Sequence, residues 1–200
     1  MTWIGDGATR TGECHEGANL AAVQRLPAIF IIQNNQVALG TRADQHTRAP
    51  LEAWGTMYGI PTERCDGNNV LEMYAATRLA AEQCRRGDGP VAIVADTFRM
   101  GGHATHDERE ARETFPERLF QSWGKRDPIG LYEEYLVAGG VDRDQLRKIE
   151  AEAEAEVEAA ADEALASRER VPEGQKALFN GVSEGGVLVG MEHRLSDSRP

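Results

Sequence analysis

Two runs of apolar and β-branched residues are the most strongly patterned parts of the chain. The first covers 28–32 (Ala-Ile-Phe-Ile-Ile), and the second begins at Val91 and continues to Thr97. A run that is apolar at nearly every position, instead of every second one, indicates a strand covered on both faces, as in a parallel sheet. Shorter strands and helix-compatible segments lie before and between these runs, at 2–4, 13–26, 62–65 and 70–86. This alternation predicts an α/β domain with a largely parallel sheet and flanking helices.

The second half of the chain has a different pattern. Residues 99–116 are polar and predict a long loop, a kind of segment that is usually functional or disordered when it occurs in a compact domain. Asp127-Pro128 is typical of a helix start, and the Ala- and Glu-rich segment 142–168 predicts a long surface helix with a narrow apolar stripe. We therefore expect an α/β domain over 1–140, a helix packed on it over 141–170, and a poorly ordered Gly-rich tail over 171–200.

Composition and charge exclude several classes of function. The chain has 33 acidic and 22 basic residues and a net charge of −11, so it would repel nucleic-acid phosphates. No apolar run reaches the roughly 18 residues of a membrane helix, and the first residues lack the pattern of a signal peptide. The three cysteines are widely spaced and odd in number, which argues against a disulfide scaffold or a structural zinc site. We expect a cytoplasmic protein with no membrane or nucleic-acid partner.

Polar motifs follow two predicted strands, where a parallel α/β sheet binds its ligands. The first is Gly5-Asp6-Gly7-Ala8, and the second is Gln33-Asn34-Asn35. Glycine amides and a helix N-terminus favour a phosphate, but the Asp6 carboxylate would repel it unless a cation lay between them. Magnesium bridges carboxylates to phosphates, and the Asn35 amide and Val37 carbonyl oxygens could complete its ligands. Either motif alone is also typical of a turn, but one strand–helix–strand unit spans the 29 positions from Asp6 to Asn35.

The paired motifs resemble those of thiamine diphosphate enzymes. The resemblance is closest to the alpha subunit of the decarboxylating component of 2-oxo acid dehydrogenase complexes, and it covers roughly residues 2–170. Further matching motifs are His15-Glu16, Asn19, Leu26-Pro27, Phe30, 65–70 (Cys-Asp-Gly-Asn-Asn-Val), Gly89-Pro90, 98–107 (Phe-Arg-Met-Gly-Gly-His-Ala-Thr-His-Asp) and 126–129 (Arg-Asp-Pro-Ile). The resemblance implies a thiamine diphosphate-binding fold. Because the family's Gly-Asp-Gly motif lies mid-chain, we expect this chain to be truncated at the N-terminus.

The resemblance implies a role for each residue of the two motifs. Asp6, Asn35 and the carbonyl of Val37 would bind magnesium, which in turn would bind the cofactor diphosphate. Gly7 and Ala8 would contact that diphosphate through the backbone. The family usually has an aromatic residue at the position of Val37, a departure that leaves the carbonyl ligand intact.

His103 resembles the histidine of the family's active-site loop. The resemblance implies that it approaches the diphosphate and transfers a proton during reductive acylation of a lipoyl group, a role that suits a side chain titrating near neutral pH. Ala104 replaces the regulatory serine that family members often carry there, and Thr105 stays open as an alternative site of such control. We assign no role to His106 and expect an exposed loop residue.

The resemblance also implies a function and partners. As an alpha subunit, the protein would act in oxidative decarboxylation of a 2-oxo acid, of the pyruvate or branched-chain (2-oxoisovalerate) type, with acyl transfer to a lipoyl group. Its partners would be a beta subunit, in a heterotetramer of two alpha and two beta chains, and a lipoyl-bearing transacylase. Two alternatives stay open: the alpha subunit of acetoin dehydrogenase, and a truncated, non-catalytic fragment that acts only in subunit association.

Overall fold

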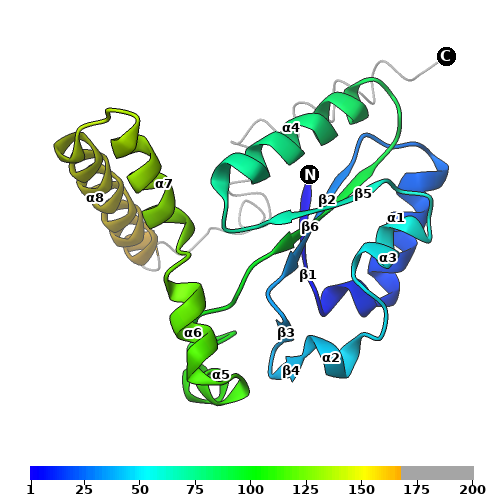
Figure 1. Cartoon of the computed structure of the whole chain (residues 1–200), viewed down its shortest axis with the longest axis horizontal. Helices are drawn as coiled ribbons and strands as arrows, with labels where there is room; N and C mark the ends of the chain where they lie inside the picture. The colour runs from blue at the N-terminus through cyan, green and yellow to red at the C-terminus, as the bar shows by residue number, and fades with distance from the viewer. Residues whose placement is uncertain (168–200) are drawn as a thin grey trace, which may run out of the picture. The chain divides into compact units, whose positions relative to one another are not determined.

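A four-stranded parallel sheet forms the centre of the structure, a computed structural model that describes residues 1–167 (Figure 1). The strand order is β1-β2-β6-β5, with β1 at Thr2–Gly5, β2 at Ile29–Asn34, β6 at Val91–Asp96 and β5 at Thr62–Asp66. The two predicted apolar runs are the central strands β2 and β6, which are buried over most of their length. The predicted α/β fold with a largely parallel sheet is confirmed.

Helices cover both faces of this sheet. On one face α1 (Gly12–Val23) and α3 (Glu52–Thr56) bury Ala18 and Trp54 against Phe30 and Ile32. On the other face α4 (Val70–Arg85) packs on Ile31 and its neighbours (Figure 1). Because successive strand residues point to opposite faces, the apolar run of β2 supplies both cores at once.

The prediction of a loop over 99–116 is wrong for the second half of this segment. This part of the chain forms α5 (Glu108–Thr114), and α6 (Glu117–Gly124) follows directly. Phe98 contacts the rings of Phe115, Phe120 and Trp123, with ring centroids 5.2 to 5.8 Å apart. This small aromatic cluster stabilises helices whose polar sequence does not predict them.

Short elements follow the first two strands. The 3-10 helix η1 (Ala8–Arg10) follows β1, and an antiparallel hairpin of β3 (Val37–Ala38) and β4 (Thr41–Arg42) follows β2. The four-residue helix α2 (Ala43–His46) continues from the hairpin.

Two helices complete the described chain, and backbone contacts divide it into units at Met1–Gly140 and from Val141 onward. α7 (Pro128–Ala138) belongs to the first unit, and the Asp127 side chain caps it by accepting the N–H of Ile129 at 2.9 Å. α8 (Arg143–Ser167) belongs to the second unit and is the long helix predicted from its Ala- and Glu-rich sequence. The packing of this helix on the α/β domain stays a prediction, and the predicted tail over 171–200 lies outside the described residues. Within residues 1–167, every helix is too short or too polar to span a bilayer.

Replacing Asn69 with alanine is expected to lower the free energy of unfolding by about 1 kcal/mol. The Asn69 Oδ1 atom caps α4 by accepting the backbone N–H groups of Leu71 (3.1 Å) and Glu72 (3.2 Å). Asn69→Asp keeps an acceptor and adds a charge that the helix N-terminus favours, so it should keep most of the stability. Urea denaturation of both variants tests this expectation, and an equal loss in both would contradict it.

Candidate functional site

The carboxyl ends of β1 and β2 bring the two predicted strand-end motifs together. Gly5 pairs with Gln33 in the parallel register. The backbone N–H groups of Asp6 and Asn35 both donate to the carbonyl oxygen of Gln33, at 3.3 and 3.0 Å. The chain therefore leaves both strands at one point of the sheet edge, as the spacing of the motifs predicts.

Asp6 is a buried carboxylate, and one of its two oxygen atoms accepts no hydrogen bond from the described residues. Its exposed fraction is 1%. The Oδ1 atom accepts the N–H of Gly7 at 3.0 Å, whereas Oδ2 is buried with no hydrogen-bond partner among the described residues. Burial raises the pKa of Asp6, against the opposing effects of the Gly7 N–H and His46. An unpartnered buried carboxylate oxygen is costly, so the chemistry of this atom fits a bound cation.

Asn35 and the hairpin that follows it provide further oxygen atoms at this edge. The Asn35 Oδ1 atom accepts the N–H of Val37 at 3.2 Å, which fixes the side chain and leaves a second lone pair on the amide oxygen. Two residues of this segment, Gln36 (φ 70°) and Leu39 (φ 53°), adopt the left-handed region that side chains rarely occupy. The amide and carbonyl oxygens of this segment, together with the Asp6 carboxylate, match the ligand chemistry of magnesium.

The hairpin packs directly against Gly7. A Cβ atom at this position would lie 2.3 Å from the Cβ of Ala38, so only glycine fits. The N–H of Gly7 is donated to the Asp6 carboxylate in this structure. The predicted backbone contacts of Gly7 and Ala8 with a diphosphate stay predictions.

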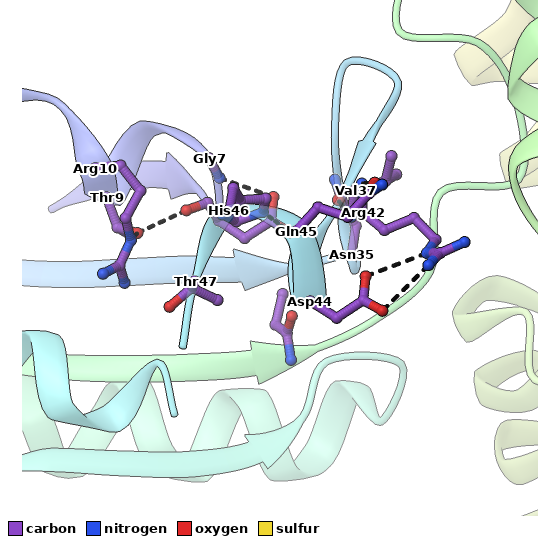
Figure 2. A network of polar contacts seen from close by, with 12 residues as sticks. Gly7, Thr9, Arg10, Asn35, Val37, Arg42, Asp44, Gln45, His46 and Thr47 are labelled. Carbon is purple, nitrogen blue, oxygen red and sulfur yellow. Dashed lines mark hydrogen bonds and ion pairs between the residues drawn. The ribbon is translucent and has the colours of Figure 1, made fainter. Parts of the chain in front are cut away.

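His46 is the residue of this site that sequence reasoning missed. It ends α2 (Figure 2), and its Nε2 atom lies 3.7 Å from the Oδ2 atom of Asp6. Its side chain is 13% exposed, and both ring nitrogens are buried without a hydrogen-bond partner in the described chain. Nothing in the spacing from Asp6 to His46 indicates this contact, because it depends on how the hairpin and α2 return the chain over β1.

The donor atoms at this edge are chemically mixed. Among residues 1–167, no three His, Cys, Asp or Glu side chains are grouped so that they could hold a metal ion. The site therefore combines a single carboxylate, from Asp6, with amide, carbonyl and imidazole groups. Asp6, Asn35 and Val37 could hold a divalent ion, with His46 beside them.

His103 lies on an exposed loop and is not brought into contact with Asp6 or Asn35. The Asp107 carboxylate shapes this loop by accepting the N–H groups of His103 (3.1 Å) and Ala104 (2.8 Å). The Glu108 carboxylate accepts the N–H of Gly102 at 2.6 Å. The loop is thus ordered by carboxylates that bind its backbone, and the His103 side chain stays exposed.

Arg99 joins the loop that carries His103 to the β3–β4 hairpin. Its guanidinium donates to the carbonyl of Gly101 at 3.0 Å and to the carbonyl of Leu39 at 2.7 Å. Leu39 belongs to the turn of the β3–β4 hairpin that also carries Val37. The Arg99 side chain therefore links the two parts of the predicted site, whose own functional side chains do not contact one another in the described structure.

Replacing Asp107 with alanine is expected to speed backbone hydrogen exchange in the loop 99–107. The N–H of Ala104, together with that of His103, lowers the pKa of Asp107 below its ordinary value of 3.8. Since the folded pKa is the lower one, the carboxylate orders the loop above pH 3.8 and stops doing so as the pH falls through the lowered pKa. Exchange measured by mass spectrometry at neutral pH tests this expectation. Glu113→Ala, on the adjacent α5, is the matched control, and equal protection in Asp107→Ala and the parent would contradict the assignment.

A charged network occupies the carboxyl ends of the other strands. The Asp96 carboxylate accepts two hydrogen bonds from Arg64 (2.7 and 3.0 Å) and one from the Asn34 amide (2.7 Å). Arg126 donates to Asp66 at 2.7 Å. These groups line a cavity of about 690 Å³. Because the charges pair with one another, we assign this network a structural role in holding β2, β5 and β6 at the sheet edge.

The fold and these residues define the chain as an α/β protein with a candidate cation and phosphate site at its sheet edge. A family model described as "Dehydrogenase E1 component" matches residues 1–173. The chain therefore belongs to the dehydrogenase E1 component family.

The curated relatives agree with this family. The chain is 38% identical over 156 residues to the pyruvate dehydrogenase E1 component subunit alpha of Acholeplasma laidlawii, covering 77% of this chain and 45% of the relative. It is 41% identical over 142 residues to the 3-methyl-2-oxobutanoate dehydrogenase subunit alpha of Mycobacterium tuberculosis, covering 70% and 38%. The somatic mitochondrial pyruvate dehydrogenase E1 alpha subunit of Homo sapiens is 35% identical over 170 residues, covering 84% and 43%. The chain spans less than half the length of these three relatives.

Solved structures resemble the fold as well. A transketolase from Campylobacter jejuni superimposes with a TM-score of 0.45 and 17% sequence identity, covering 73% of this chain and 27% of the transketolase.

Proposed function

We propose that the protein is the alpha subunit of a 2-oxo acid dehydrogenase complex and binds thiamine diphosphate through magnesium. The observation that carries the proposal is the buried Asp6 carboxylate, whose Oδ2 atom accepts no hydrogen bond from residues 1–167 and lies at the sheet edge beside Asn35. Membership of the dehydrogenase E1 component family supports this cofactor. A buried carboxylate oxygen that accepts no hydrogen bond from residues 1–167, with only His46 at 3.7 Å beside it, has no structural purpose that the fold explains. It therefore also argues against a role in subunit association alone.

Each residue of the site has a defined part in this proposal. Asp6, Asn35 and the Val37 carbonyl would hold the ion beside the diphosphate, and Gly7 and Ala8 would contact the diphosphate through the backbone. When bound, thiamine diphosphate supplies the carbanion chemistry that releases carbon dioxide from the 2-oxo acid. The His103 imidazole would hold a proton and transfer it during acyl transfer to the lipoyl group.

The partners of this reaction are part of the same proposal. A beta subunit completes the active site in a heterotetramer of two alpha and two beta chains, a lipoyl-bearing transacylase accepts the acyl group, and the complex works in the cytoplasm. The relatives include both pyruvate and branched-chain enzymes by name. We therefore propose a substrate among these two classes of 2-oxo acid, with acetoin as the alternative.

Turnover with a panel of 2-oxo acids tests the proposed reaction. The protein, reconstituted with its beta partner, magnesium and thiamine diphosphate, should release carbon dioxide from pyruvate or a branched-chain 2-oxo acid. Cleavage of acetoin without any 2-oxo acid turnover would favour the alternative. Assembly with the beta subunit and no turnover of either kind would contradict a catalytic role.

His103→Ala is expected to slow acyl transfer to lipoamide on the order of 100-fold, with a smaller effect on decarboxylation. The imidazole is exposed on a loop ordered by Asp107, so its removal should leave the fold and the metal site intact. Single-turnover assays of the two half-reactions separate the effects. His106→Ala on the same loop is the matched control. Equal slowing of both steps by His103→Ala would contradict the assignment.

A further inference from the structure

His46 and Asp6 form a pair of buried polar groups whose requirements are not met within the described chain. The Asp6 Oδ2 atom and both ring nitrogens of His46 are buried and lack hydrogen-bond partners among residues 1–167. Buried polar atoms are nearly always partnered in native proteins, so three unpartnered atoms at one place indicate a missing ligand.

The distance between the pair fits a shared ion better than a hydrogen bond. Nε2 of His46 lies 3.7 Å from Oδ2 of Asp6, which is beyond the usual hydrogen-bond range. Two donor atoms that each bind one ion at about 2.1 Å can be at most about 4.2 Å apart. The observed separation therefore leaves room for a divalent ion to bind both atoms.

The surrounding backbone fixes the position of His46. The N–H of Ala43, which opens α2, donates to the carbonyl of Gln36 at 2.9 Å, and the N–H of Thr47 donates to the carbonyl of Ala43 at 2.9 Å. Gln36 lies between Asn35 and Val37, the two other predicted ligands. The turn that carries those ligands therefore also sets the start of the helix that carries His46.

We propose that His46 provides a nitrogen ligand to the divalent ion held by Asp6 and Asn35, so that the site favours a transition ion such as Mn²⁺ over Mg²⁺. This inference rests on the proposed metal site and adds a ligand and an ion preference to it. Magnesium binds oxygen ligands, whereas imidazole suits zinc, copper, iron and nickel; Mn²⁺ accepts the oxygen ligands of magnesium and belongs to the same first-row series as the ions that imidazole suits. The mixed set of carboxylate, amide, carbonyl and imidazole donors therefore lowers selectivity for magnesium.

Pulsed electron paramagnetic resonance of bound Mn²⁺ tests this ligand directly. The protein, assembled with its beta partner, is loaded with Mn²⁺ and inorganic pyrophosphate, a probe that contains no nitrogen. We expect the coupling of a directly bound imidazole nitrogen, and we expect it to disappear in His46→Gln while Mn²⁺ remains bound. His106→Gln, on the exposed loop, is the matched control and should keep the coupling.

Competition between ions provides the second measurement. The parent should bind Mn²⁺ at least about 10-fold more tightly than Mg²⁺, and His46→Gln should lose most of this preference. Bound Mn²⁺ without a nitrogen coupling would overturn the role of His46 and leave the proposed metal site standing. Failure of the parent to bind either ion with pyrophosphate would overturn the metal site itself, and this inference with it.

Discussion

Asp6→Asn is expected to weaken magnesium-dependent binding of thiamine diphosphate on the order of 100-fold and, at the same time, to stabilise the metal-free protein. Both effects have one cause. The carboxylate is buried, and its Oδ2 atom accepts no hydrogen bond from residues 1–167. The negative charge that attracts the ion is a cost to the fold when the ion is absent. Asparagine keeps an oxygen that accepts the Gly7 N–H and presents a neutral amide toward His46.

The gain in stability should be on the order of 1 kcal/mol in the absence of metal. Since burial raises the pKa of Asp6, its unfavourable contribution is absent below the unfolded pKa and is complete above the folded pKa. The advantage of Asp6→Asn should therefore be largest at neutral pH and vanish in acid. Denaturation at several pH values measures stability, and calorimetry with and without Mg²⁺ measures binding.

Asp44→Asn is the matched control for this experiment. Asp44 lies on the same short helix as His46, but it is exposed and pairs with Arg42. The same chemical change there should leave cofactor affinity unchanged. Since Arg42 lowers the pKa of Asp44, any effect of Asp44→Asn on stability should be a loss at neutral pH, opposite in sign to the gain expected for Asp6→Asn. Unchanged affinity in Asp6→Asn would contradict the metal assignment, and a loss of stability in the metal-free protein would contradict the account of the buried charge.

Gly7→Ala is expected to destabilise the protein by about 1–3 kcal/mol and to displace the hairpin that carries Val37. The added Cβ would lie 2.3 Å from the Cβ of Ala38. The two backbones must separate, since neither atom belongs to a flexible side chain. Because the hairpin also carries the Val37 carbonyl, cofactor affinity should fall together with stability.

A second substitution distinguishes this clash from other effects of Gly7→Ala. Ala38→Gly removes the opposing Cβ, so the double variant should recover most of the stability and most of the cofactor affinity. Chemical denaturation and calorimetry of the two single variants and the double variant measure the coupling. Strictly additive losses would show that contact with Ala38 is not the reason for glycine at this position.

The fold was largely predictable because its strongest signals are local. The apolar run at 29–32 and the one beginning at Val91 form the two central strands, and their burial on both faces follows from their composition. The convergence of Asp6 and Asn35 was predictable for a related reason. Consecutive parallel strands return to the same sheet edge, so the spacing of the motifs is enough to bring them together.

The features that the sequence did not predict depend on contacts between distant residues. The helices α5 and α6 are polar in sequence and are stabilised by a cluster of aromatic rings on Phe98. His46 reaches Asp6 only because the hairpin after Asn35 and the short helix α2 bring the chain back to the carboxyl end of β1. Neither the period of apolar residues nor the motif spacing contains this information.

The position of His103 shows a further limit of motif reasoning. The motif around His103 predicts a functional loop, and the structure holds its backbone through Asp107 and Glu108. The approach of His103 to the diphosphate stays a prediction, since the described chain places its side chain on the surface.

The central claim is that one divalent ion is held jointly by Asp6 and Asn35 at the carboxyl ends of β1 and β2. Its most direct test is a crystal structure of the protein with its beta partner, Mn²⁺ and thiamine diphosphate, with anomalous diffraction recorded to locate the manganese. The account predicts an anomalous peak within about 2.5 Å of both the Asp6 carboxylate and the Asn35 amide oxygen. A peak bound to the diphosphate but distant from these two side chains would contradict it.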